Sequence, residues 1–175
     1  FDFVHASPQC THYSLARTTA KTPRNFELAD SLVLKALEII EYFHPRCGWT
    51  LENPGTGYLK TRVFMRDLAH VEVTYCSYGE PYRKLIFFWN NLGESWKPRP
   101  CCRKPNWCQG FAANHKHSKT AQQGPCKNRK GCAPGRDKED TCSINELYHL
   151  TAELCDEIAL AVNQKLALDH KEHNE

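Results

Sequence analysis

The sequence predicts an α/β domain built on an open sheet, with a basic, cysteine-rich insert and C-terminal helices. The chain opens with strand, helix and strand patterns in that order, which is typical of an open α/β sheet. Its 175 residues are 41% hydrophobic and 25% charged, a composition that suits one globular domain and excludes a disordered tail, a collagen-like fibre or a coiled coil. Periodic patterns stop between residues 94 and 140, where the insert lies.

The first strand and the first helix follow from short apolar patterns. Residues 1–5 (FDFVH) are apolar and alternating, so they predict a buried strand. Because the chain opens directly on this strand, we expect it to continue a longer domain. A polar loop leads to a helix at residues 26–43, with Asn25 as its cap and Pro45 beyond its end. Apolar residues recur in this helix at helical spacing: Leu28, Leu32, Leu34, Ala36, Ile39, Ile40 and Phe43.

Three further strands are expected in the first half of the chain. Residues 47–51 (CGWTL) predict a second buried strand that closes at Glu52, and a short polar helix or turn follows. Residues 70–75 alternate cleanly, and residues 85–89 form a continuous apolar run of strand length. Ligands of open α/β sheets bind at the carboxyl ends of strands, and both Cys10 and Glu52 are expected just beyond such ends.

Helical patterns resume after the insert. Ser143 and Glu146 have the spacing of a capping box, and Thr151 is the expected cap of a longer helix that reaches Ala167. The inward positions of that helix are Leu154, Ile158, Ala161, Val162 and Leu166. We therefore expect three regions: an α/β core at 1–93, the insert at 94–142, and helices at 143–175 that pack on the core.

Three short motifs carry the chemistry. Cys10 follows the first strand in Ser-Pro-Gln-Cys, and Glu52 follows the second in Glu-Asn-Pro. The third motif, Tyr-Gly-Glu-Pro-Tyr-Arg-Lys at 78–84, opens a strand. Each motif alone is weak, because a cysteine after a strand is usually structural and Glu-Asn-Pro is a common turn.

Taken together and in this order, the motifs resemble those of the DNA cytosine-5 methyltransferases, in particular short phage-type or virus-type members. The resemblance covers residues 2 to about 93 and implies a partial Rossmann-like methyltransferase sheet. It implies that Cys10 is the nucleophile, which attacks carbon 6 of a cytosine flipped out of the DNA helix. Glu52 would donate a proton to ring nitrogen 3, Asn53 would hold the loop, and Arg83 or Lys84 would supply a cation.

The departures from the family pattern concern the loop and the cofactor. Gln9 stands where the family usually has proline, and Tyr82 where it usually has glutamine. The family's Phe-x-Gly-x-Gly loop and its acidic residue, which bind S-adenosylmethionine, do not occur in residues 1–175. We expect them before Phe1, so this chain alone is expected to be inactive or nearly so.

The insert is strongly basic. Residues 97–138 hold eleven Lys and Arg against one acid, a net charge of +10 in a chain of net charge +3. Such a segment suits the phosphate backbone of DNA, although a solvated loop has a similar composition. Under the resemblance the insert is the target-recognition region. The expected DNA-binding residues are Arg103, Lys104, Lys116, Lys119, Lys127, Arg129 and Lys130.

Cysteines gather in the same segment. Six of the ten lie between residues 101 and 142, and two pairs share one spacing, with His115 and His117 between them. Zinc takes four such ligands, which makes the pairs a candidate site, but their spacing is wider than usual, and exposed thiols in a loop are the slightly favoured explanation. The candidate ligands are Cys102, Cys108, Cys126 and Cys132.

Three functions therefore remain open. The first is a methyltransferase that acts on double-stranded DNA with S-adenosylmethionine; the second is an inactive remnant that binds DNA; the third is a zinc-binding interaction protein. A cysteine hydrolase is less favoured, because no motif places a histidine near Cys10. No apolar run approaches the ~20 residues that span a bilayer. With thiols spread through the body, we expect an intracellular monomer, in the nucleus or in the cytoplasm of a bacterial or virus-infected cell.

Overall fold

The computed structural model describes residues 1–17, 20–111, 116–121 and 141–172. They form two compact units. The first unit comprises Phe1–Val73, Leu85–Pro98 and Asp156–Glu175, and the second comprises Thr74–Lys84 and Arg99–Cys155. The chain is a mixed α/β protein, as the sequence predicts.

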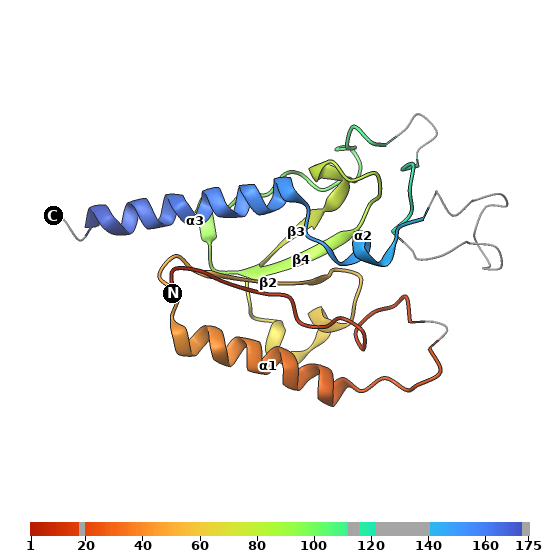
Figure 1. Ribbon diagram of the computed structural model, residues 1–175, viewed down its shortest axis with the longest axis horizontal. Helices are drawn as coiled ribbons and strands as arrows, with labels where there is room; N and C mark the ends of the chain where they lie inside the picture. The colour runs from red at the N-terminus through yellow and green to blue at the C-terminus, as the bar shows by residue number, and fades with distance from the viewer. Residues whose placement is uncertain (18–19, 112–115, 122–140, 173–175) are drawn as a thin grey trace. The chain divides into compact units, whose positions relative to one another are not determined.

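A four-stranded sheet is the centre of the fold (Figure 1). Its strands are β1 (Val4–Ala6), β2 (Trp49–Pro54), β3 (His70–Thr74) and β4 (Leu85–Asn90), in the order β1-β2-β4-β3. β1 and β2 are parallel, whereas β2 and β4 are antiparallel, so the sheet is mixed. All four expected strands are present, and the short helix or turn expected after β2 is formed by two 3-10 helices, Leu59–Thr61 and Val63–Met65.

Helix α1 (Phe26–Phe43) connects the two parallel strands and has the predicted bounds. The Asn25 side chain accepts a hydrogen bond from the Leu28 amide at 2.9 Å, which confirms the predicted cap. The predicted buried face is largely wrong. Ala29, Val33 and Ile40 are buried, whereas five of the seven expected positions are exposed: Leu28, Leu32, Leu34, Ile39 and Phe43. The small side chains of Ala29 and Val33 join the core formed with Leu51 and Trp89.

Two helices end the chain. Helix α2 (Ile144–Tyr148) has the predicted capping box, in which Ser143 and Glu146 each bond the other's backbone amide. Helix α3 (Ala152–Glu172) begins at the predicted cap, since Thr151 Oγ1 accepts from the Leu154 amide at 3.3 Å. Three of its predicted inward residues are buried: Leu154, Ile158 and Ala161.

Within the first unit, helices flank the sheet. The Trp96 indole donates to Glu157 at 2.9 Å, and Lys165 donates to the Asn91 carbonyl at 3.1 Å, so α3 from Asp156 onward lies along the strands. Figure 1 shows α1 on the opposite side of β2 and β4. In the described part of the chain, no helix combines the length and apolar character that crossing a membrane requires.

Candidate functional site

The carboxyl ends of β1 and β2 bring two of the predicted motifs together. The Ser7 hydroxyl donates to Glu52 Oε2 at 2.5 Å, and the Asn53 amide donates to the Pro8 carbonyl at 2.9 Å. Cys10 is half-buried and lies two residues after Pro8. The parallel pairing of β1 with β2 explains this meeting, because parallel neighbours end at the same edge of a sheet.

Glu52 and Asn53 lie inside β2, which runs on to Pro54, three residues beyond its predicted end. The strand continues because Glu52 pairs with Phe88 and Asn53 with Phe87, both in the apolar run of β4. Successive residues of a strand point to opposite faces of the sheet. The loop after β1 is therefore held from both faces, by Glu52 on one and by Asn53 on the other.

Both polar side chains are removed from water. Glu52 is 7% exposed and Asn53 is 1% exposed. Within the described residues, Asn53 Oδ1 is a buried acceptor without a hydrogen-bond partner. Leaving such a group unpaired costs about 1–3 kcal/mol, so a buried orphan of this kind usually serves a ligand or an ordered water. The Asn53 side-chain nitrogen therefore has a hydrogen-bond partner, whereas its oxygen has none among the described residues.

Sequence reasoning missed two polar residues, one in the loop that follows β1 and one in β1 itself. The first is Ser7, which donates to the Glu52 carboxylate. Its position between the predicted strand and Pro8 was the only feature of the sequence that could have marked it. His5 contacts Thr50 on the neighbouring strand, with 2.8 Å between Nδ1 and Oγ1. Burial lowers the pKa of His5 and so favours its neutral form.

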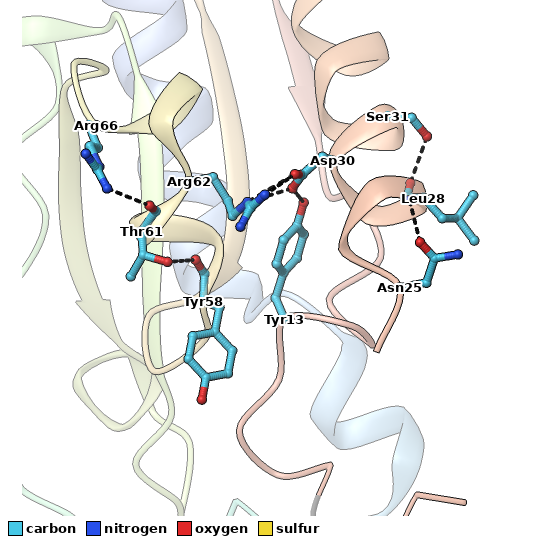
Figure 2. A network of polar contacts seen from close by, with 9 residues as sticks. All are labelled: Tyr13, Asn25, Leu28, Asp30, Ser31, Tyr58, Thr61, Arg62 and Arg66. Atoms are coloured by element: carbon cyan, nitrogen blue, oxygen red, sulfur yellow. Dashed lines mark hydrogen bonds and ion pairs between the residues drawn. The ribbon is translucent and has the colours of Figure 1, made fainter. Parts of the chain in front are cut away.

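A polar network anchors the loop that carries Cys10 (Figure 2). The Cys10 carbonyl accepts from the amides of Tyr13 and Ser14, at 3.0 and 2.9 Å, which closes a tight turn. Tyr13 is fully buried, and its hydroxyl donates to Asp30 of α1 at 2.7 Å. Arg62 forms an ion pair with the same carboxylate at 2.5 Å. Tyr13 therefore ties the loop to α1, and burial together with Asp30 raises its pKa.

Replacing Tyr13 by phenylalanine is expected to lower the free energy of unfolding by about 1.5–3 kcal/mol, because it removes a hydrogen bond to a charged group. Urea denaturation measures this change. Tyr42→Phe is the matched control, since Tyr42 is 77% exposed and its hydroxyl should contribute little. Equal stability of the two variants would contradict the anchoring role of Tyr13.

The predicted cations Arg83 and Lys84 lie in the second unit and differ in exposure. Arg83 is exposed, and its Nε donates to the Cys102 carbonyl at 2.9 Å. Lys84 is half-buried, donates to the Leu147 carbonyl, and lies 4.8 Å from the centre of the Tyr75 ring. Tyr82, at the position where the family has glutamine, is fully buried. Of the two cations, Arg83 is the more accessible to a ligand.

The second unit also contains a cluster of four possible metal ligands, namely Cys76, Cys102, Cys108 and His117. Their ligand atoms all lie within 4.8 Å of one another. The cluster includes the predicted ligands Cys102 and Cys108, whereas Cys126 and Cys132 lie outside the described residues. Sequence reasoning missed Cys76, which lies beyond the end of β3 and had no paired cysteine nearby to mark it.

The cluster is electrostatically suited to a cation. Burial and the neighbouring thiols raise the pKa of Cys76, and burial likewise raises the pKa of Cys108. Burial, with a smaller contribution from Arg83, lowers the pKa of His117. Three crowded thiolates repel one another, and metal binding relieves that repulsion because it requires deprotonated cysteine and neutral histidine.

The basic residues of the insert are only partly described. Arg103, Lys104 and Lys116 are exposed, as phosphate contacts require. Lys119 forms an ion pair with Glu146 at 2.7 Å. The remaining predicted DNA-binding residues, Lys127, Arg129 and Lys130, lie outside the described part of the chain. Lys119 therefore has a protein partner from which a phosphate would have to displace it.

Glu146 is expected to titrate at unusually low pH. Bonds from Lys119 and from the amide and hydroxyl of Ser143 lower its pKa from 4.5 to about 2. Because the folded-state pKa is depressed, the stabilisation is present above pH 4.5 and is lost as the pH falls towards 2. NMR titration of the Glu146 carboxyl carbon measures this value, and Lys119→Met should raise it. A midpoint near 4.5 in the unaltered protein would contradict the ion pair.

Comparison with known proteins does not assign the chain to a family. No family model and no curated protein matches it. Its function must therefore be inferred from the residues themselves.

Proposed function

We propose that this chain carries the catalytic loop of a DNA cytosine-5 methyltransferase, with Cys10 as its nucleophile. The meeting of the Cys10 loop with Glu52 and Asn53 at the ends of two parallel strands supports this proposal most directly. These residues come from segments more than forty positions apart.

The proposed reaction begins at the cytosine ring. The Cys10 thiolate adds to carbon 6 while protonated Glu52 donates to nitrogen 3, so the electron pair displaced from the ring double bond is stabilised as an enamine. Carbon 5 thereby becomes nucleophilic. S-adenosylmethionine, when bound, supplies an electrophilic methyl group. Loss of the carbon 5 proton to solvent, departure of Cys10 and return of the nitrogen 3 proton to Glu52 restore the aromatic ring, the free thiolate and the acid.

Two further residues, Ser7 and Asn53, are proposed to position Cys10 and Glu52. Ser7 and Asn53 hold the loop after β1 against β2, with hydrogen bonds of 2.5 Å to Glu52 and 2.9 Å from Asn53. The open Oδ1 of Asn53 is a further acceptor for a donor on the loop or on the base. Of the two cations in the second unit, Arg83 is the better candidate for the role that the family resemblance implies, because Lys84 is half-buried against Leu147 and Tyr75.

DNA binding is assigned to the basic insert. Exposed Arg103, Lys104 and Lys116 are proposed to contact phosphates, a role that positions the protein without reading sequence. Lys127, Arg129 and Lys130, which lie outside the described residues, are proposed to bind phosphates as well. No residue of the chain is assigned to the cofactor, since the family's glycine-rich cofactor motif does not occur in its sequence.

Exchange of the cytosine carbon 5 proton with solvent tests the nucleophile without any cofactor. When Cys10 adds to carbon 6, the enamine takes a deuteron from heavy water at carbon 5, and reversal releases the original proton. We expect the chain to deuterate carbon 5 in a pool of random single-stranded and duplex oligonucleotides, measured by proton NMR. Cys10→Ser should abolish the exchange.

Cys155→Ser is the matched control, because Cys155 is an exposed thiol on α3. It should exchange at the unaltered rate. Exchange that survives in Cys10→Ser, or no exchange in the unaltered chain, would overturn the proposal. Retained oligonucleotide binding without exchange would instead favour the inactive DNA-binding module, which the basic insert and the cysteine–histidine cluster also suit.

A further inference from the structure

We infer that Cys76, Cys102, Cys108 and His117 form a structural zinc site. This ligand set differs from the one that sequence spacing suggests, because Cys76 and His117 replace Cys126 and Cys132. It joins Cys76, in the short helix after β3, to three residues of the second unit that lie much later in the chain, namely Cys102, Cys108 and His117.

The separations fit a tetrahedral ion. Zinc lies about 2.3 Å from sulfur and about 2.0–2.1 Å from nitrogen, so tetrahedral angles place a sulfur and a nitrogen ligand about 3.6 Å apart. The His117 Nε2 atom lies 3.6 Å from Cys102 Sγ and 3.3 Å from Cys108 Sγ. All four ligand atoms lie within 4.8 Å, against about 3.8 Å for two sulfurs on one zinc. Closing the largest of these separations to the zinc value takes a change of at most about 1 Å.

Neighbouring groups hold the ligands in place. The Cys102 amide donates to Thr74 Oγ1 at 2.9 Å, and its carbonyl accepts from Arg83 Nε at 2.9 Å. The Phe111 amide donates to the Cys108 carbonyl at 3.0 Å. The Phe111 ring and the His117 imidazole meet edge-on with centroids 5.4 Å apart, and the Trp107 ring stacks on the Phe111 ring with centroids 4.0 Å apart. Such contacts orient metal ligands before the metal binds.

The donor set specifies both the metal and its role. Three thiolates and one imidazole are a soft set that favours zinc over calcium or magnesium, which prefer oxygen. Four protein ligands fill the tetrahedron and leave no position for water or substrate, as in structural zinc sites. Cys76 and Cys102 are buried, so the ion would be shielded from solvent on that side.

Metal analysis of the purified chain tests the site. We expect one zinc per chain and loss of that zinc in Cys76→Ser, Cys102→Ser and Cys108→Ser. The double variant Cys126→Ser/Cys132→Ser should retain a full equivalent. It is the decisive control, because it separates this ligand set from the one suggested by spacing.

Variants of His117 and substitution of Co²⁺ for zinc test the site even where a cysteine variant fails to fold. His117→Ala should lose zinc, whereas His117→Cys retains four ligands and should keep it. With Co²⁺ in place of zinc, the unaltered chain should show the visible bands of a tetrahedral ion and thiolate-to-metal absorption. His117→Cys should shift those visible bands and strengthen the thiolate absorption.

A chain without zinc after expression in zinc-supplemented medium would overturn the inference. So would loss of zinc from the Cys126/Cys132 double variant together with its retention in Cys76→Ser. The inference does not rest on the proposed reaction, since the metal content is measured without DNA or cofactor. A zinc-containing chain that fails to exchange the cytosine proton would contradict only the proposed function.

Discussion

Replacement of Glu52 by glutamine is expected to slow cytosine carbon 5 exchange by about 10²–10⁴-fold, the usual contribution of a positioned general acid. Glutamine has nearly the same shape and can still accept the hydrogen bond from Ser7, but it cannot deliver a proton to the ring. The variant should therefore remain folded while losing most of its activity. Proton NMR of the oligonucleotide measures the rate, and thermal unfolding reports whether the fold persists.

Ser7→Ala is the companion variant. It leaves the Glu52 carboxyl intact and removes the hydroxyl that holds it, so exchange should fall by less than in Glu52→Gln. The pH dependence separates the two effects: Glu52 must be protonated to act, so Ser7→Ala should keep the fall in rate at high pH and Glu52→Gln should lose it. Unaltered exchange in Glu52→Gln would contradict the acid role of this residue.

Chelation of the inferred zinc is expected to unfold the second unit while the first remains ordered. Zinc supplies about 10–16 kcal/mol of apparent binding free energy in zinc-finger peptides, which exceeds the stability of most small domains. Hydrogen exchange of the whole chain with and without chelator measures the effect. The Cys102 and Phe111 amides should lose protection, whereas the β2 and β4 amides should keep it.

The contrast between the units makes this result informative. The first unit has its own apolar core around Leu51, Trp89 and Met65, which contains none of the inferred ligands. Protection that persists throughout the second unit after metal removal would show that packing alone maintains it. Loss of protection in β2 and β4 as well would show that the two units unfold together.

The elements of the fold were predictable wherever local chemistry decides them. The α1 bounds, the Asn25 cap and the Ser143 capping box depend on residues within one turn, and all three are confirmed. The buried face of α1 was not predictable, because this helix has apolar residues on both sides and only the sheet selects between them. The end of β2 depends likewise on pairing with β4, thirty residues later.

The candidate site was predictable only in part, for the same reason. Strand order along the chain was enough to expect Cys10 near Glu52, since parallel neighbours end together. The cysteine–histidine cluster depends on how Cys76 approaches residues 102–117, which no spacing within the insert reveals. Equal spacing of two cysteine pairs drew attention to Cys126 and Cys132, although a complete set of four ligands lies among the described residues without them.

Glu52 and Asn53 lie on opposite faces of β2, and this arrangement constrains how the strand can change in evolution. A substitution at either position alters one contact of the loop and leaves the other in place. The insertion or deletion of one codon in β2 before Glu52 would instead turn both side chains to the wrong faces, because strands repeat every two residues. Natural variation here should therefore preserve the number of residues between Trp49 and Pro54.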